Sequence, residues 1–284
     1  MITYLFDGTE NGLFTCVFES FYEKQNPDVV TDKSVQTGFL DETKTIATDR
    51  SKAARVLNCV KKCKTKYLYS DFIEALKSGE EDKFTKIFKY LRFAIANKDS
   101  DISDAFSVSE VLAFRDMIMR INYEVHRFKG FIRFAETNEG FYYAHFEPDN
   151  DITEYLVPHF LRRMKRPFIL HDTKRNVIAL CVDGKYKMIY GGDNTYTVYL
   201  SEEETNFRNL WKSYYKTVNI AERKNTRQMK NYMPVRYWKN LPEKQDNIED
   251  FQSFYDYRNA KNCNIKTCFS FCGKQVFKTD LFIS

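Results

Sequence analysis

The chain has 284 residues, of which 43% are hydrophobic and 29% are charged, and its formal net charge is +5. This composition is typical of a folded globular protein and excludes an intrinsically disordered chain. No apolar run approaches the ~20 residues that a helix needs to cross a bilayer, and the first residues lack the basic and apolar regions of a secretory signal. We therefore expect a cytoplasmic protein with no membrane partner.

The front portion of the chain is predicted to be mainly helical. A short strand over 3–8 opens it, an amphipathic helix follows, and a second strand is expected near 43–48. From about 49 to 127 the pattern is helical. Helix starts are predicted at Ser78 and Ser107, because a Glu three residues later completes a capping box in each case.

Between 129 and 192 the apolar period falls to two, which predicts strands. A first hairpin is expected to turn at 138–140, and further strands are separated by polar turns at 173–176 and 183–184. A helix starting near Asp151 lies between the two groups of strands. Adjacent hairpin strands favour an antiparallel sheet with packed helices, so the predicted fold class is α+β.

The last long helix is predicted to start at Ser201 and to bury an apolar face. That face comprises Phe207, Leu210, Trp211, Tyr214 and Val218. No linker rich in Pro, Gly or Ser marks a domain boundary. The simplest division gives a mainly helical portion over 1–105, a sheet-centred basic and aromatic portion over 106–244, and a divergent C-terminal appendage over 245–284.

Positive charge is concentrated in residues 205–244. This stretch holds ten Lys or Arg against two Glu, a net charge of +8, together with both tryptophans and five Tyr or Phe. Lys and Arg displace phosphate counterions, and exposed rings stack on unpaired bases, so this composition indicates nucleic acid binding. The alternative is an amphipathic helix with a solvated basic face and core aromatics.

All four histidines lie between positions 126 and 171, which favours a functional pocket in the sheet-centred portion. His145 and Glu147 are expected to share one strand face, with Asp151 in the loop beyond it. One His with nearby carboxylates suits acid–base catalysis or a divalent cation, so these three are the candidate catalytic residues. The alternative is that Asp149 or Asp151 caps the following helix.

Two groups of residues are candidates for nucleic acid binding. The first, Arg127, Lys129 and Arg133, precedes the histidine-bearing strand. Here Phe131 and Arg133 are expected to share a strand face, and an ion pair with Glu124 or Glu147 is the competing interpretation.

The second group, Arg223, Arg236, Tyr237 and Trp238, follows the last long helix. Pro234 predicts a rigid turn that presents a guanidinium and two rings, and the Arg236 fork suits phosphate. Trp238 filling a gap in the core is the alternative. We expect this turn and the histidine-bearing hairpin to converge on one concave surface.

Seven cysteines, without the spacing of a secreted scaffold, favour free thiols. Near the end of the chain, Cys263, Cys268 and Cys272 have neither zinc-motif spacing nor the iron–sulfur spacing of radical S-adenosylmethionine (SAM) enzymes. There is also no Gly-rich phosphate loop, Rossmann fingerprint, GxSxG elbow or HExxH motif. The cysteine spacing and the missing motifs therefore give no reason to expect a bound metal or cofactor.

Three segments carry a family resemblance: YLFDGTENGLFTCVFESFYE, HRFKGFIRFAETNEGFYYAHFEPDNDI and LWKSYYKTVNIAERKNTRQMKNYMPVRYW. The chain resembles an uncharacterised bacterial family linked to DNA metabolism or DNA repair, whose members are encoded beside a radical SAM protein. Related domains occur fused to a uracil-DNA glycosylase-like domain. The resemblance covers roughly residues 2–244. Within it, Gly130 is interpreted as a point of close backbone approach.

The resemblance implies a DNA-binding accessory protein that works with a radical SAM partner in DNA modification or repair. A uracil-DNA glycosylase-like domain is a further implied partner. The family supplies no catalytic residues to carry over. Two alternatives stay open: a stand-alone enzyme that acts on DNA or nucleotides through a pocket at His145, and a protein-interaction adaptor.

Overall fold

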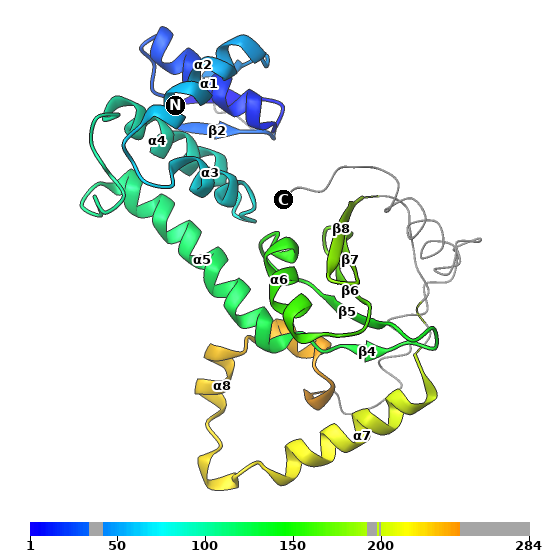
Figure 1. Ribbon diagram of the computed structural model, residues 1–284. Helices are drawn as coiled ribbons and strands as arrows, with labels where there is room; N and C mark the ends of the chain where they lie inside the picture. The colour runs from blue at the N-terminus through cyan, green and yellow to red at the C-terminus, as the bar shows by residue number, and fades with distance from the viewer. Residues whose placement is uncertain (34–41, 192–197, 199, 245–284) are drawn as a thin grey trace. The chain divides into compact units, whose positions relative to one another are not determined.

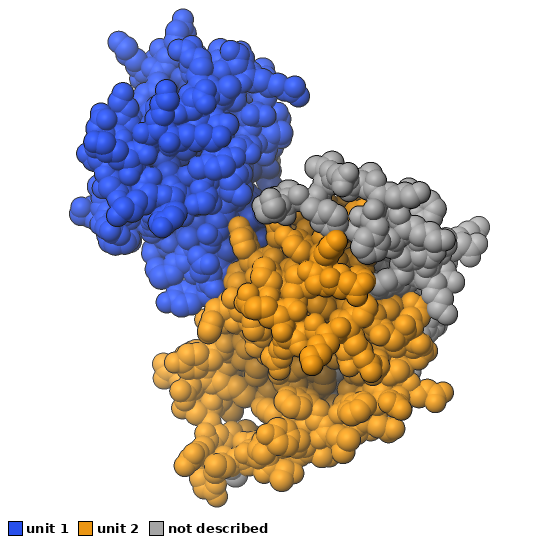
Figure 2. Space-filling view, in the orientation of Figure 1, with its two compact units in different colours: residues 1–124, 149–151 blue, residues 125–148, 152–284 orange. Residues whose placement is uncertain are grey.

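The computed structural model describes residues 1–33, 42–191, 198 and 200–244 (Figure 1). The chain forms two compact units, which Figure 2 shows in different colours. Unit 1 comprises residues 1–124 and 149–151, and unit 2 comprises residues 125–148 and those from 152 onward. The units divide inside a long helix, whereas the boundary suggested at 105 precedes that helix. The predicted appendage over 245–284 lies outside the described residues.

Unit 1 combines a small parallel sheet with helices. Its strands are β1 (Ile2–Leu5), β2 (Val29–Thr31) and β3 (Glu42–Thr45), in the order β2-β1-β3. Its helices are α1 (Glu10–Tyr22), α2 (Arg50–Lys62), α3 (Leu68–Leu76), α4 (Lys83–Ala96) and the first part of α5 (Ser109–Phe131). The mainly helical portion predicted ahead of the main sheet is confirmed, but the parallel pairing of β1 with both neighbours was not predicted.

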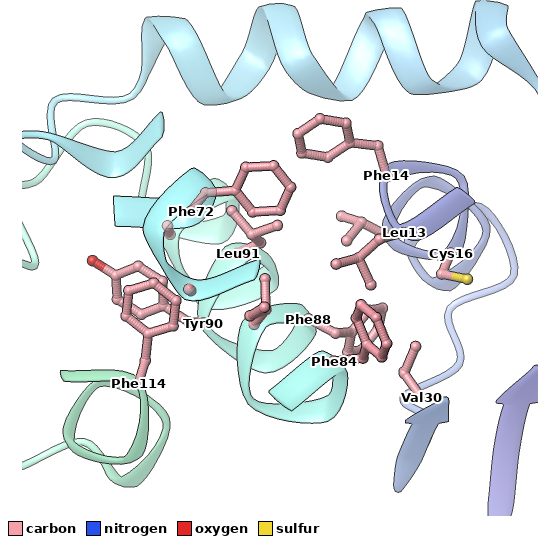
Figure 3. Close-up of a cluster of buried hydrophobic side chains, with 14 of the residues drawn as sticks. Leu13, Phe14, Cys16, Val30, Phe72, Phe84, Phe88, Tyr90, Leu91 and Phe114 are labelled. Atoms are coloured by element: carbon pink, nitrogen blue, oxygen red, sulfur yellow. The ribbon is translucent and has the colours of Figure 1, made fainter. Parts of the chain in front are cut away.

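Aromatic rings from four helices fill the core of unit 1 (Figure 3). The rings of Phe14 and Phe72 stack with centroids 4.8 Å apart, and those of Tyr90 and Phe114 stack at 3.9 Å. Each of these side chains is almost completely buried. The helical apolar period correctly identified the buried faces of α4 and α5, because that period depends only on which side of a helix meets the core.

Both predicted starts of these helices were a few residues too early. α4 begins at Lys83 and α5 at Ser109. Ser78 instead uses its hydroxyl to accept a hydrogen bond from the backbone N–H of Glu80 at 3.2 Å, in the turn that precedes α4. A serine hydroxyl stabilises turns as well as helix N-termini, so the capping pattern alone placed the start of α4 wrongly.

Asp7, just beyond the end of β1, is hydrogen-bonded both to the start of α1 and to the loop that precedes α2. Its carboxylate accepts hydrogen bonds from the hydroxyls of Thr48 at 2.6 Å and Thr9 at 2.7 Å, and these bonds lower its pKa. Thr9 in turn caps α1 by accepting from the backbone N–H of Gly12 at 3.0 Å. A Cβ at Gly12 would lie 2.2 Å from Asp7 Oδ1, so this close approach requires glycine.

Unit 2 is built on a five-stranded, mostly antiparallel sheet in the order β4-β5-β6-β7-β8. Its strands are β4 (Ala135–Glu136), β5 (Tyr142–Phe146), β6 (Phe168–Asp172), β7 (Val177–Val182) and β8 (Lys185–Tyr190). Only β5 and β6 pair in parallel, and α6 (Thr153–Arg163) lies between them in the chain. The α+β class and the hairpin turns are confirmed. The parallel pair was not predicted.

Two predictions around residue 130 are wrong, because α5 continues to Phe131. The backbone N–H of Ile132 still bonds to Phe128 O at 3.1 Å, so Phe131 and Arg133 do not share a strand face. Gly130 lies within the exposed part of this helix. A Cβ at that position would meet no atom within 4 Å, so Gly130 marks no close backbone approach.

The last described part of unit 2 consists of helices and 3-10 turns. These are α7 (Glu202–Thr217), η1 (Ala221–Arg223), α8 (Thr226–Tyr232), η2 (Val235–Asn240) and η3 (Pro242–Lys244). The predicted start of α7 is confirmed, but its predicted burial is wrong. The five apolar side chains expected in the core are 39–65% exposed. Helical spacing identified this apolar face correctly but carried no information on whether another element covers it.

The environment of Gly12 gives a stability prediction with a matched control. Gly12→Ala should lower the free energy of unfolding by about 1–3 kcal/mol, because the methyl group displaces the Asp7 carboxylate. Gly130→Ala should instead raise it by about 0.5 kcal/mol, since that helical site is open and alanine restricts the unfolded chain. Urea unfolding of both variants measures the difference. Equal effects would contradict the close approach at Gly12.

Candidate functional site

The histidine-bearing strand β5 and the turn η2 lie side by side in unit 2. Lys239 Nζ contacts the Glu147 carboxylate at 2.6 Å, and His145 has a side-chain hydrogen bond with Asn240. Two segments almost a hundred residues apart in sequence therefore meet. The concave surface that the sequence analysis expected them to form stays a prediction. Lys239 and Glu147 are both about 40% exposed, so this ion pair lies at the surface and contributes little stability.

Asp151 falls in a different unit from His145 and Glu147. It belongs to unit 1, where it forms an ion pair with Lys77 Nζ at 3.2 Å and its backbone N–H bonds to Lys77 O at 2.9 Å. It does not cap α6 either, because the residue at the cap position is Ile152, with no side-chain capping bond. The three candidate catalytic residues thus form no single cluster within either unit, and their catalytic role stays a prediction.

Asp149 likewise serves the structure of unit 1. Its backbone N–H and that of Asn150 donate to the two carboxylate oxygens of Glu124, at 2.7 and 2.8 Å. The Asn150 amide adds a third hydrogen bond to the same carboxylate at 2.6 Å. Glu124 is buried, so these donors replace the water that its charge would otherwise need.

The register of the sheet places a second histidine beside the first. His145 on β5 is aligned with His171 on β6. The Tyr143 hydroxyl lies 2.7 Å from His171 Nδ1, and His171 Nε2 lies 3.3 Å from Asn176 Oδ1. A neutral His171 satisfies both contacts when Nε2–H donates to Asn176 and Tyr143 donates to Nδ1. Sequence analysis missed this chain of hydrogen bonds because it depends on cross-strand register.

Burial keeps these groups uncharged at neutral pH. Desolvation first, and then His171 and Arg208, lower the pKa of His145 to about 4. Desolvation also lowers the pKa of His171 and raises that of Tyr143. Such groups can exchange hydrogen bonds and accept a proton, but they cannot supply the positive charge that binds phosphate. Any phosphate contact in unit 2 must come from its exposed cations.

The pKa of His145 makes the stability of the protein depend on pH. Its folded-state pKa of about 4 lies below the ordinary value of 6.5, so the unfolded chain binds the proton first as the pH falls. We expect the free energy of unfolding to decrease between pH 6.5 and 4, and His145→Gln to reduce that decrease. Urea midpoints measured across this range test it. The exposed His126→Gln serves as the control, and an equal effect of the two substitutions would contradict the burial of His145.

Glu204 anchors the first turns of α7 to the sheet. Its Oε2 accepts the backbone N–H of Glu136 at 3.0 Å, and its Oε1 accepts Arg208 Nε at 2.8 Å. Glu204 and Arg208 are both buried, and Arg208 is close enough to His145 to lower the pKa of that histidine. This contact holds the start of α7 near the histidine pair.

Glu243 anchors the middle of α7 to η3. It accepts hydrogen bonds from Trp211 Nε1 at 3.0 Å and from Arg133 Nη2 at 2.8 Å, while the Arg133 guanidinium lies 5.6 Å from the Trp211 ring centroid. Burial by itself raises the pKa of Glu243, but a backbone hydrogen bond and the charge of Arg133 hold it below its ordinary value. Arg133 is therefore ion-paired, but with Glu243 and with neither Glu124 nor Glu147, the two partners that the sequence analysis named.

The candidate nucleic-acid-binding residues differ widely in exposure. Arg223 and Arg236 are exposed, Arg127, Lys129, Arg133 and Trp238 are partly buried, and Tyr237 is buried. The ring of Tyr237 is only 3% exposed and packs against Phe128. Trp238 Nε1 donates to the backbone oxygen of Met233 at 2.9 Å. The turn therefore presents the Arg236 guanidinium but not a pair of free rings.

A different set of residues forms the exposed basic and aromatic surface. We call residues 207–232, from α7 through η1 to α8, the cationic segment. Its exposed rings are Phe207, Trp211, Tyr214 and Tyr232. Six of its cations have no ion-pair partner among the residues the structure describes: Lys212, Lys216, Arg223, Lys224, Arg227 and Lys230. On α8 a cavity of about 410 Å³ is lined by Arg227, Tyr232 and the amides of Asn225, Gln228 and Asn231.

Metal-binding and membrane-spanning features are absent from the part of the chain that the structure describes. Within it, no three His, Cys, Asp or Glu side chains lie close enough to hold a metal ion. None of the helices within the same ranges is long and apolar enough to cross a bilayer. Cys16, Cys59, Cys63 and Cys181 are free thiols. The cluster of Cys263, Cys268 and Cys272 lies outside the described residues.

Comparison with protein-family models gives one match. The model is described as a domain of unknown function, DUF4130, and it matches residues 81–243, more than half of the chain. The chain belongs to the DUF4130 family. No curated protein and no solved structure matches it significantly. The DUF4130 region includes both histidines of the sheet, Glu243 and the whole cationic segment, whereas the parallel sheet and α1–α3 precede it.

Proposed function

We propose that this DUF4130 protein is a DNA-binding accessory protein in DNA modification or repair and that it works with a radical SAM partner. The observation that carries the proposal is the cationic segment, which combines four exposed rings with six cations that have no ion-pair partner among the described residues. Cations already paired with carboxylates would lose those pairs on binding a phosphate. These six cations have no such ion pair to lose, so their charge is available to a polyanion.

The geometry of α8 favours single-stranded over fully paired DNA. Arg227 and Tyr232 line its cavity together with three side-chain amides, which can both donate to and accept from the edges of bases. Tyr232 is 70% exposed, so one face of its ring can stack on an unpaired base. A base flipped out of a damaged duplex offers the same face and edges.

Salt dependence tests the phosphate contacts. Arg223→Gln combined with Arg227→Gln should make the plot of log affinity against log salt shallower, by about 0.7 for each phosphate of a single strand that the variant no longer neutralises. Tyr232→Ala should instead weaken binding by about 1–3 kcal/mol without changing the slope, because stacking releases no counterions. Fluorescence anisotropy with a labelled oligonucleotide measures both quantities.

The matched control is the pair Arg162→Gln and Arg163→Gln at the end of α6, since both side chains are exposed arginines of unit 2 outside the cationic segment. Their substitution should leave the slope unchanged. No binding to single- or double-stranded DNA, or binding that salt does not weaken, would overturn the proposal. An equal loss in the control pair would show that net charge, not the cationic segment, holds the DNA.

The partnership with a radical SAM protein rests on the resemblance and on exposed aliphatic side chains. Leu210 is 65% exposed, Val218 52%, Ile220 49% and Val235 52%. Aliphatic side chains neither stack on bases nor contact phosphate, whereas a protein partner can bury them. The segment thus suits a protein contact as well as DNA. This is also the observation that favours an adaptor, the second candidate function.

Co-purification distinguishes the adaptor from the DNA-binding protein. Leu210→Ser should weaken association with the proposed radical SAM partner, whether or not nuclease is added, because buried apolar area drives the contact. Leu112→Ser, on α5 and 44% exposed, is the control. Association that disappears with nuclease would mean that DNA bridges the two proteins. Association without any intrinsic DNA affinity would select the adaptor.

A further inference from the structure

A groove lies on the surface of unit 1, formed by α1, α2 and α4. Its cavity of about 360 Å³ is lined by Phe18, Phe21 and Tyr22 of α1, by Arg55 and Cys59 of α2, and by Ile95 of α4. Phe21 is 39% exposed and Tyr22 is 77% exposed. A groove of this size with accessible rings can take a small molecule that contains one flat ring system. It is separate from the cationic segment of unit 2.

Two guanidinium groups lie over rings that line this groove, that of Arg55, which is itself a lining residue, and that of Arg92, which is not. Arg55 Cζ is 5.0 Å from the ring centroid of Phe18, and Arg92 Cζ is 5.3 Å from that of Phe21. Neither arginine has an ion-pair partner among the described residues. Arg92 Nε is also shielded from solvent and has no hydrogen-bond partner. A buried donor without an acceptor is costly, so a ligand that supplies an acceptor there is stabilised.

The nearby carboxylates of α1 are already neutralised. Glu19 forms an ion pair with Lys52 at 2.5 Å, and Glu23 forms one with Lys44. The positive charge left at the groove therefore belongs to Arg55 and Arg92. An anion that enters meets two guanidinium groups, and the α1 carboxylates that could repel it are occupied.

We propose that this groove binds a nucleotide, with the base against the aromatic rings of α1 and the phosphate at the Arg55 guanidinium, and with the charge of Arg92 beside Phe21 adding to the attraction. Rings from one helix give a base an apolar face to stack on, and guanidinium forks bind phosphate through two parallel hydrogen bonds. The same chemistry is offered by a free nucleoside monophosphate and by the phosphorylated end of a DNA strand. This site does not depend on DNA binding by the cationic segment.

Titration calorimetry of the full chain tests the site, with adenosine monophosphate and a 5′-phosphorylated trinucleotide as separate probes. Arg55→Gln, Arg92→Gln and Tyr22→Ala should each weaken binding of the probe that binds, by about 10-fold. Arg50→Gln, another exposed arginine of α2, and Tyr67→Ala, 77% exposed as Tyr22 is, should not. Thermal unfolding confirms that each variant is folded. Binding of the trinucleotide alone would identify a strand end as the ligand, and binding of both would identify a nucleotide site open to either.

Cys59 provides a readout that is independent of affinity. Its half-buried side chain lines the groove, so a bound nucleotide should slow its alkylation by iodoacetamide several-fold, measured by peptide-resolved mass spectrometry. Labelling of Cys63 should not change. Arg223→Gln with Arg227→Gln should leave this protection intact, which separates the groove from the cationic segment. No binding of either probe, binding that survives Arg55→Gln and Arg92→Gln, or an unprotected Cys59 would overturn the proposal.

Discussion

Two buried carboxylates, Glu204 and Glu243, hold α7 in place, and the exposed surface of unit 2 depends on them. Glu204 bonds to the backbone beside β4 and to Arg208, and Glu243 bonds to Trp211 and Arg133. Because these contacts are polar, the apolar side chains of α7 other than Trp211 are not needed to attach it. The helix can therefore keep rings and aliphatic groups exposed, which a helix packed by its apolar face cannot do.

The charges of unit 2 are separated by burial. The histidine pair is uncharged because desolvation opposes protonation, whereas the cations of α7 and α8 other than Arg208 are exposed or partly exposed. The exposed cations can therefore bind a polyanion, whereas the uncharged histidine pair can exchange hydrogen bonds with a neutral group. Arg208 links the two regions, since it belongs to α7 and also lowers the pKa of His145.

Unit 1 also combines arginines with aromatic rings, but in a groove instead of along a helix. At its groove, guanidinium groups lie over phenylalanine rings instead of pairing with carboxylates, and the carboxylates of Glu19 and Glu23 are paired with lysines. Neither Arg55 nor Arg92 stood out in the sequence, because single arginines in helices are usually solvated. The structure singles them out because each guanidinium lies over a phenylalanine ring and has no ion-pair partner among the described residues. Tyr143 and His171 are likewise singled out by the structure, since they are 28 residues apart and meet only through the pairing of β5 with β6.

The sequence by itself determined the local features: the helical front portion, the hairpin turns, the apolar faces of α4, α5 and α7, and the concentration of positive charge after residue 205. These depend on residue periodicity and turn chemistry, which act within a few residues. Only the tertiary structure decided which apolar face is covered, which cations are paired and which histidines meet. The apolar faces of α7 and α5 both have helical spacing, yet the face of α7 is exposed and that of α5 is buried. Burial and pairing depend on segments far away in the chain, and local sequence patterns do not record them.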